Sequence, residues 1–328
     1  MGEVRTSRDP GTGYCALDRL PVTCVRVYQI AQVPDDVPDL PEQLGTRPKF
    51  WFLKNRQNFL FKEARSGTGE DWSEKTSSEL ATLLDLPHAT YDLAVWRRKR
   101  GVITPSFVPE GASLVHGNEL IARLVKGYEV SATFRTSQHT IGRVFTFVSL
   151  PVVGPPLDFT TTPGLRSGAD VFVGYLMLDA WIANQDRHHE NWGLVRTEEG
   201  NIHLAPSYDH ASSLGRNEMD AKRRARLDSR DPAHSMLAYV ARARSAFYSG
   251  VSDRRPLPCI DAFRWAASKR PGAAREWLDR LANLETGSVT RVFQSIPDAL
   301  ITEAGREFAL SILSHNKQRL MKTREELS

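Results

Sequence analysis

Apolar and polar residues alternate in the first third of the chain, which predicts short β-strands. An alternating run covers residues 22–33, and a proline-rich acidic connection, 34–43, follows it. Two apolar-aromatic runs, 49–53 and 58–64, flank a polar turn. Residues 90–108 repeat this pattern around the basic turn Arg97 to Gly101. We therefore expect one strand and two β-hairpins.

A different pattern begins at residue 171. The run 171–183 is almost continuously apolar, with Asp170 before it as the expected N-cap, and it predicts a buried core helix. The run is too short for a membrane span and contains Asp179. The helix is followed by a polar loop and then by two apolar runs, 192–195 and 202–209, with a turn between them. This pattern predicts a further β-hairpin after the helix.

Helical periodicity accounts for most of the remaining chain. A helix ending at Leu84 follows the flexible turn 66–72, with leucines on its core face. Residues 121–168 mix helical and loop signals, and for 141–154 the pattern leaves helix and strand both open. Near the C-terminus we expect three helices, over Cys259 to Ala267, Gly272 to Leu284 and Ala304 to Glu326.

Composition narrows the cellular setting. The chain has 328 residues and a net charge of +4, which suits a protein that handles polyphosphates but does not require nucleic acid. The basic run 97–101 is more typical of a solvated hairpin, so no direct nucleic-acid binding is expected. Cys15, Cys24 and Cys259 are too far apart in sequence for a metal motif. With no apolar leader at the N-terminus, a reducing cytoplasmic location is the expectation, without membrane association.

The candidate chemistry lies in the loop after the core helix. Asp186-x-x-x-x-Asn191, followed by a hairpin ending in Asp209, has the spacing of a phosphoryl-transfer loop and its metal-binding aspartate. Asp186 would accept the proton of an acceptor hydroxyl. Asn191 and Asp209 would supply oxygen ligands for Mg²⁺. An isolated match to this spacing is common, so its weight comes from the order helix, polar loop, hairpin and carboxylate.

These residues also carry a family resemblance. Asn184-x-Asp186-Arg187-His188-x-x-Asn191-x-Gly193, followed by Ala205-Pro206-x-Tyr208-Asp209-His210, resembles the kinase domain of HipA-like serine/threonine kinases. The Asp-Arg-His-x-x-Asn core is also similar to the loop of phosphoinositide kinases. The resemblance implies ATP and Mg²⁺ as cofactors, a protein substrate with a serine or threonine acceptor, and an antitoxin-like partner. Toxin activity is an open hypothesis.

The resemblance implies further site residues in the first hundred positions. Lys62, at the end of an apolar strand, would bind phosphate oxygens, although a lysine at a fraying strand end is the common alternative. Glu74 would hold Lys62, with Glu79 as the competing candidate and a capping box with Asp71 as the structural alternative. A short phosphate-facing loop, of which Thr46 is the best candidate for autophosphorylation, consists of Gly45, Thr46, Arg47, Pro48 and Lys49.

Other positions have weaker expectations. Arg187 would fix the loop through backbone carbonyls or a phosphate, and His188 would orient Asp186 or line the site, with a structural role equally open. Backbone groups between Phe107 and Glu110 would meet the adenine. His116 is expected to be structural. The polar, basic stretch 212–230 lies where a substrate loop would be.

These expectations combine into a bilobal protein-kinase-like α+β fold, with a small antiparallel β lobe and a larger, mostly helical lobe. A flexible N-terminus is expected over 1–20, the N-terminal lobe over 21–110 and the C-terminal lobe over 111–328. The alternatives are a lipid or small-molecule kinase, a non-catalytic nucleotide-binding interaction protein, and a nucleotidyl transferase on the same fold.

Overall fold

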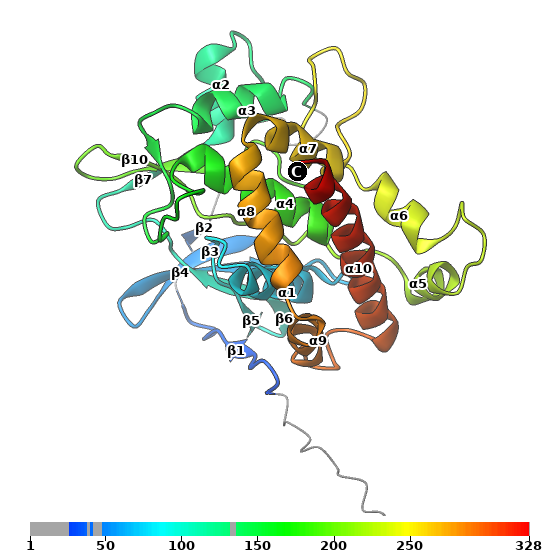
Figure 1. Ribbon diagram of the computed structural model, residues 1–328. Helices are drawn as coiled ribbons and strands as arrows, with labels where there is room; N and C mark the ends of the chain where they lie inside the picture. The colour runs from blue at the N-terminus through cyan, green and yellow to red at the C-terminus, as the bar shows by residue number, and fades with distance from the viewer. Residues whose placement is uncertain (1–25, 38–39, 42–47, 132–135, 328) are drawn as a thin grey trace, which may run out of the picture.

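Two lobes lie side by side in the structure, a computed structural model that describes residues 26–37, 40–41, 48–131 and 136–327 (Figure 1). Within these residues the smaller lobe holds a six-stranded sheet in the order β1-β5-β6-β4-β3-β2 and the helix α1. Its elements are β1 (Ala31–Gln32), β2 (Leu40–Pro41), β3 (Lys49–Lys54), β4 (Gln57–Glu63), α1 (Glu70–Leu83), β5 (Asp92–Trp96) and β6 (Lys99–Pro105).

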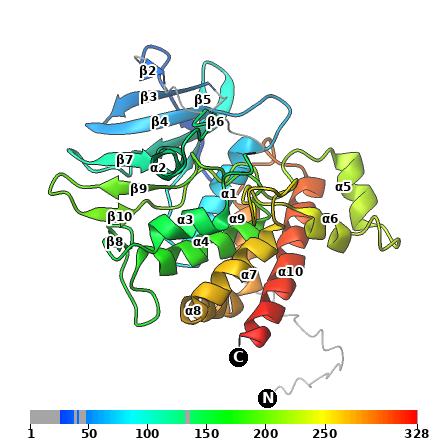
Figure 2. The ribbon, with the colours of Figure 1, turned by 90° about the horizontal axis from the view of Figure 1, so that it is seen from above.

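The larger lobe is mostly helical but also carries a sheet, which in the described residues has four strands in the order β7-β9-β10-β8. Its elements are β7 (Ser113–His116), α2 (Gly117–Leu124), α3 (Ile141–Val148), β8 (Val153–Gly154), α4 (Gly168–Ile182), β9 (Gly193–Arg196), β10 (Ile202–Leu204), α5 (Asp220–Leu227), α6 (Met236–Arg242), α7 (Cys259–Lys269), α8 (Pro271–Asn283), α9 (Thr286–Gln294) and α10 (Glu303–Glu326). Seen from above, α1 lies between the small-lobe sheet and these helices (Figure 2).

Local turn chemistry forms the two predicted hairpins of the small lobe. Asn55 and Arg56 have positive φ angles of 52° and 65°, and Arg97 and Arg98 have 46° and 65°. Two successive residues with positive φ make the turn whose twist matches paired antiparallel strands. In the first hairpin this register places Lys49 directly opposite Lys62.

The small sheet departs from expectation at its edge. The predicted strand over 22–33 is reduced to the two residues of β1, and residues 22–25 lie outside the described part of the chain. β1 pairs with β5 in parallel, so the lobe is not purely antiparallel as predicted. The reason is topological, because β1 reaches the sheet from a separate segment and not through a tight turn.

The centre of the large lobe is α4, the predicted core helix. Fourteen of its fifteen residues are buried, which is the pattern of a helix apolar on all sides. Gly174 allows α8 to come close, since a Cβ at that position would lie 2.5 Å from the Trp277 ring. The N-cap is Ser167 and not Asp170, which instead closes the capping box from the third helical position.

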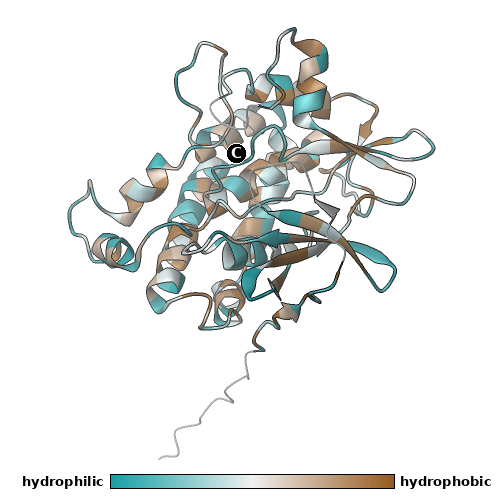
Figure 3. Ribbon diagram, turned by 180° about the vertical axis from the view of Figure 1, so that it is seen from behind, coloured by the Kyte–Doolittle hydropathy of each residue, from teal (hydrophilic) through white to brown (hydrophobic). Residues whose placement is uncertain are grey.

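Four helices, α3, α7, α8 and α10, pack against α4. Hydrophobic and hydrophilic residues alternate along the helix ribbons (Figure 3). The three predicted C-terminal helices are present as α7, α8 and α10, whereas the short α6 and α9 were not predicted. The ambiguous stretch 141–154 is helical in α3 and extended only at β8. Among the described residues, no helix has the length and apolar character needed to cross a membrane.

Candidate active site

The loop that carries Asp186 begins at the last turn of α4. Ala183 adopts a left-handed conformation with φ 55°, which ends the helix and turns the chain toward the cleft. Asn184 then donates from Nδ2 to Asp179 Oδ1 at 2.8 Å. Its own Oδ1 accepts from the backbone N–H of Asp186 at 3.2 Å. The core helix thus fixes the position at which Asp186 leaves it.

Arg187 lies behind this loop and is 1% exposed. Its guanidinium pairs with Asp179 through both Nε and Nη2, the latter at 2.7 Å. It also donates to the Asn191 carbonyl at 3.1 Å and to Ser207 Oγ at 2.9 Å. Burial opposes its charge, but the Asp179 carboxylate outweighs burial and raises the pKa of Arg187. Of the two roles expected for Arg187, these contacts favour fixing the loop over binding phosphate.

The Asp186 carboxylate faces the cleft and has a defined set of neighbours. Oδ2 accepts a hydrogen bond from Ser212 Oγ at 3.1 Å. Oδ1 lies 3.9 Å from His188 Nε2, and the other ring nitrogen of His188 accepts from the Glu190 N–H at 3.2 Å. His188 therefore lines the site next to Asp186, a position that is compatible with both expected functional roles, orienting Asp186 or lining the site.

Asn191 and Asp209 face the same cleft from the loop and from the segment after β10. Asn191 Nδ2 donates to the Asp186 backbone carbonyl at 2.7 Å. This hydrogen bond uses the amide nitrogen and leaves the amide oxygen to act as a ligand. Asp209 has a left-handed φ of 58°. One carboxylate and one amide oxygen form a donor set that fits a hard divalent cation.

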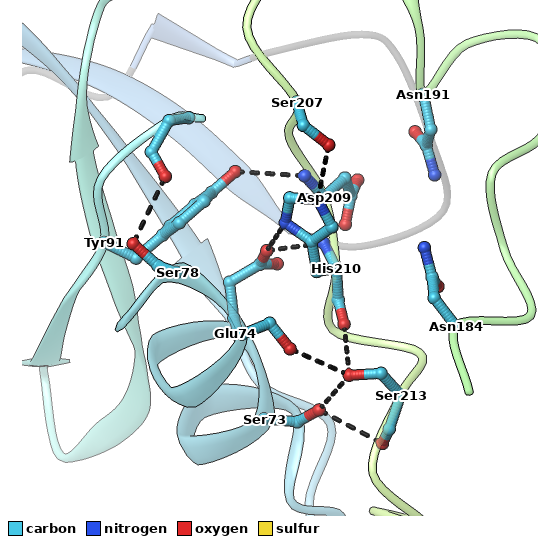
Figure 4. A network of polar contacts seen from close by, with 12 residues as sticks. Ser73, Glu74, Ser78, Tyr91, Asn184, Asn191, Ser207, Asp209, His210 and Ser213 are labelled. Carbon is cyan, nitrogen blue, oxygen red and sulfur yellow. Dashed lines mark hydrogen bonds and ion pairs between the residues drawn. The ribbon is translucent and has the colours of Figure 1, made fainter. Parts of the chain in front are cut away.

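Lys62 connects the small lobe to Asp209. Its ammonium lies 3.1 Å from Glu74 Oε2 and 2.8 Å from Asp209 Oδ1. Glu74 is fully buried, and its other oxygen accepts from the His210 backbone N–H at 2.6 Å. Glu79 instead pairs with Lys75 at 2.6 Å. Glu74, and not the alternative glutamate, therefore contacts Lys62 in the described structure, and the polar network in Figure 4 joins α1 to the Asp209 segment.

Buried aromatic and imidazole groups support this network. The hydroxyl oxygen of Tyr91 accepts from the Asp209 N–H at 3.3 Å, and Lys62 Nζ lies 5.4 Å from the Tyr91 ring centroid. Burial raises the pKa of Tyr91, with the charge of Glu74 as a smaller cause. His210 contacts Ser207 Oγ through Nε2 at 2.7 Å, and burial keeps its pKa well below the usual value. Both groups are neutral near pH 7.

One cavity of about 540 Å³ is lined by the side chains that face the cleft, namely Lys62, Tyr91, Asp186, His188, Asn191 and Asp209. Its lining also includes Phe107 and Val108, in the stretch expected to meet adenine, and Lys49 from the predicted phosphate loop. Gly45, Thr46 and Arg47 lie outside the described residues. A cavity of this size is typical of a small-molecule site. His116 makes structural contacts, since Nδ1 lies 2.9 Å from the Glu190 carbonyl and 3.1 Å from the Tyr208 hydroxyl.

Sequence reasoning missed several residues of the site. Ser212 and Arg216 fall in a stretch that reads as a polar loop, and Glu70 reads as an ordinary acidic residue at a helix start. Tyr91 lies directly before β5, and the sequence gives no sign that it contacts Asp209. The one available signal was the position of 212–216 directly after the metal-binding aspartate. Spacing alone did not show which of these side chains turn inward.

The two lobes, with this set of residues in the cleft between them, define a kinase-like fold. The structure resembles that of the Helicobacter pylori proinflammatory kinase CtkA with a TM-score of 0.69 and 16% identity, over 92% of this chain and 98% of CtkA. It also resembles HipA of Shewanella oneidensis MR-1, solved with HipB and operator DNA, with a TM-score of 0.53 and 14% identity, over 88% of this chain and 65% of HipA. The predicted HipA-like, bilobal α+β fold is thereby confirmed.

Comparisons of the sequence itself give no further assignment. No protein-family model matches the chain, and no curated protein matches it. The HipA match spans slightly less than two thirds of that protein.

Proposed function

We propose that this protein is an ATP- and Mg²⁺-dependent kinase that transfers the γ-phosphate to a serine or threonine hydroxyl of a protein. The observation that carries the proposal is the connection of Lys62 to both Glu74 and Asp209, in a cavity that also contains Asp186 and Asn191. This set matches the parts required for phosphoryl transfer, in which positioning and charge stabilisation supply most of the catalysis.

Each residue has a distinct role in the proposal. Lys62, held by Glu74, contacts phosphate oxygens, and Lys49 approaches them from the neighbouring strand. Asn191 and Asp209 hold the metal. Bound Mg²⁺ would neutralise negative charge on the phosphates.

The acceptor end of the site depends on Asp186. Its carboxylate orients the acceptor hydroxyl and takes its proton. His188 lies beside this carboxylate, and Arg187 keeps the loop in place from behind. The backbone between Phe107 and Glu110 would receive the adenine.

The test is incubation with γ-labelled ATP, Mg²⁺ and a mixture of generic protein acceptors. Wild-type protein is compared with Asp186→Ala and Asp209→Asn, and Asp231→Asn serves as the control because Asp231 is an exposed carboxylate within its own loop. We expect label on phosphoserine or phosphothreonine in the wild type and the control, with loss in both site variants. Absence of label from every acceptor, with no ATP binding, would refute the proposal.

Two further arms separate related activities. Label on lipid or small-molecule acceptors, without label on protein, would keep the kinase and change its substrate class. Product label from α-labelled and not γ-labelled ATP would indicate nucleotidyl transfer.

A toxin-like role with an antitoxin-like partner is a second proposal, supported by the likeness to HipA, which was solved together with HipB. We expect growth arrest when the wild-type protein is expressed in a bacterial host and none with Asp186→Ala. Equal growth with both proteins would contradict toxicity without affecting the kinase proposal.

A further inference from the structure

A chain of polar contacts joins Asp186 to the first turn of α1. Ser212 Oγ donates to Asp186 Oδ2 at 3.1 Å, and Arg216 Nη2 donates to Ser212 Oγ at 2.9 Å. Arg216 Nη1 pairs in turn with Glu70 Oε1. The link from Ser212 to Asp186 spans 26 positions and the link from Arg216 to Glu70 spans 146, whereas Ser212 and Arg216 are four residues apart in one segment.

From these contacts we infer that Ser212 and Arg216 are positioning residues, which orient the Asp186 carboxylate and couple it through Glu70 to α1. The inference rests on the proposed kinase function and extends it. It assigns roles to two residues that neither the motif nor the fold assigns.

The direction of the hydrogen bonds supports this inference. An arginine guanidinium has only donors, so Ser212 Oγ must accept from Arg216. The single hydroxyl proton of Ser212 is then directed to Asp186. A carboxylate otherwise rotates broadly about its last torsion, and a fixed contact at Oδ2 sets the direction in which Oδ1 points. Ser212 therefore restricts the orientation of the proposed proton acceptor.

Arg216 is itself firmly held at the other end of the chain of contacts. It is 8% exposed, and Glu70 is 1% exposed. Glu70 Oε2 also accepts from the Arg65 backbone N–H at 3.0 Å, and the Gly69 N–H donates to the Arg216 carbonyl at 3.3 Å. Because a buried ion pair is costly to break, Arg216 keeps its position relative to α1.

The same helix thus supports both halves of the proposed chemistry. Glu70 and Glu74 are four residues apart, so they project from one face of α1. Glu74 holds Lys62, and Glu70 holds the contacts that lead to Asp186. Through these two glutamates, α1 contacts the groups proposed to bind phosphate and to accept the proton.

The test measures kcat and the KM for ATP in Ser212→Ala, Ser212→Thr and Ser77→Ala. Ser77 is a matched control because its buried hydroxyl contacts Ser213 Oγ at 3.0 Å in the same interface, but does not line the cavity. We expect Ser212→Ala to lower kcat by about 10- to 100-fold, the range for loss of one hydrogen bond to a charged group, with the KM for ATP unchanged within about twofold. Ser212→Thr should restore kcat to within about threefold of wild type, and Ser77→Ala should match wild type within about twofold.

Failure of the inference is distinguishable from failure of the proposed function. If wild type transfers phosphate and Asp186→Ala does not, a Ser212→Ala variant with wild-type kcat overturns only the inference. Equal losses in Ser212→Ala and Ser77→Ala would also overturn it, because they would indicate general loosening of the interface. A wild type that transfers no phosphate to any acceptor refutes the proposed function, and the inference with it.

A thermal double-mutant cycle tests the contact without using activity. The Tm is measured for Ser212→Ala, Asp186→Asn and the double variant, with Ser77→Ala and Asp186→Asn as the control pair. We expect the two shifts in the Ser212 cycle to be non-additive and those in the control cycle to add. Additive shifts in both cycles would show that Ser212 and Asp186 are not coupled, which overturns the inference.

Discussion

The helices α1 and α4 are both mostly buried, but their buried residues differ in polarity. In α1, eleven of fourteen residues are buried, and eight of these are polar or charged. In α4, fourteen of fifteen are buried, and Asp179 is the one charged residue among them. Burial is usually unfavourable for a polar group unless a partner replaces water. The contrast therefore shows that α1 is held by specific partners and α4 by apolar packing.

The partners of α1 belong to the candidate site. Glu74 contacts Lys62 and the His210 backbone, while Ser73 contacts Ser213 at 2.9 Å. α4 instead packs against α7, α8 and α10 in the main hydrophobic core. Replacement of Glu74, the α1 residue that contacts Lys62, should thus affect chemistry more than stability, and replacement of an apolar residue on α4 should do the reverse.

The largest expected effect is a loss of catalytic activity on substitution of Glu74 in the polar helix α1. Glu74→Gln keeps the size of the side chain but removes the charge opposite Lys62, so we expect kcat/KM for ATP to fall by about 10²- to 10³-fold. Steady-state kinetics measure the loss, and the far-ultraviolet circular dichroism spectrum should remain that of wild type. A variant that is unfolded at 25 °C would show that α1 acts mainly as a core element.

The next largest effect is a loss of stability on substitution of a core residue in the apolar helix α4. Leu176 is 1% exposed, and Leu176→Ala should lower the free energy of unfolding by about 2–5 kcal/mol because it leaves a cavity in the core. Urea unfolding measures the change, and the folded protein should keep the wild-type KM for ATP. A loss of affinity for ATP at unchanged stability would break the proposed division between the helices.

A smaller effect concerns a polar group in the apolar core. Burial lowers the pKa of His139 to about 3, and its neutral ring contacts the Ala246 carbonyl at 3.0 Å and accepts from Trp192 Nε1 at 3.1 Å. Above pH 6.5 both folded and unfolded states hold this ring neutral. Below pH 6.5 the unfolded state binds one more proton at His139 than the folded state does. The free energy of unfolding therefore decreases by about 1.4 kcal/mol for each unit by which the pH is lowered, until the pH reaches the pKa of His139 in the folded state.

Urea unfolding at several pH values between 7.5 and 5 measures this dependence. His139→Gln is the comparison variant, and the slope is the informative quantity because the substitution also removes hydrogen bonds. We expect the slope below pH 6 to be shallower in the variant by roughly the contribution of one proton. Identical slopes in the two proteins would contradict a neutral buried His139.

The smallest effect comes from the exposed side of α1. Glu79, whose side chain is 30% exposed, pairs with Lys75 one turn away. Glu79→Gln should change the free energy of unfolding by less than about 1 kcal/mol and kcat by less than about twofold. The same kinetic and urea measurements apply. A loss of activity equal to that of Glu74→Gln would mean that the two glutamates are not distinguished by their contacts.

Local patterns predicted much of the fold. Apolar runs on either side of a polar or basic turn predicted the hairpins of β3–β4 and β5–β6, and the apolar run 171–183 predicted α4. Where local signals were weak, prediction failed. The seven-residue α6 and nine-residue α9 depend on contacts with larger helices, and the parallel pairing of β1 depends on a partner more than sixty positions away.

By itself, the sequence determined the two small-lobe hairpins, the core helix and the spacing of Asp186, Asn191 and Asp209, because local geometry follows from adjacent residues. Only the tertiary structure decided that Glu74 and not Glu79 meets Lys62, and that Arg216 reaches Glu70 across 146 positions. The physical reason is that an ion pair depends on distance in space. Several glutamates and arginines suit each role chemically, and the packing of α1 against the Asp209 segment selects among them.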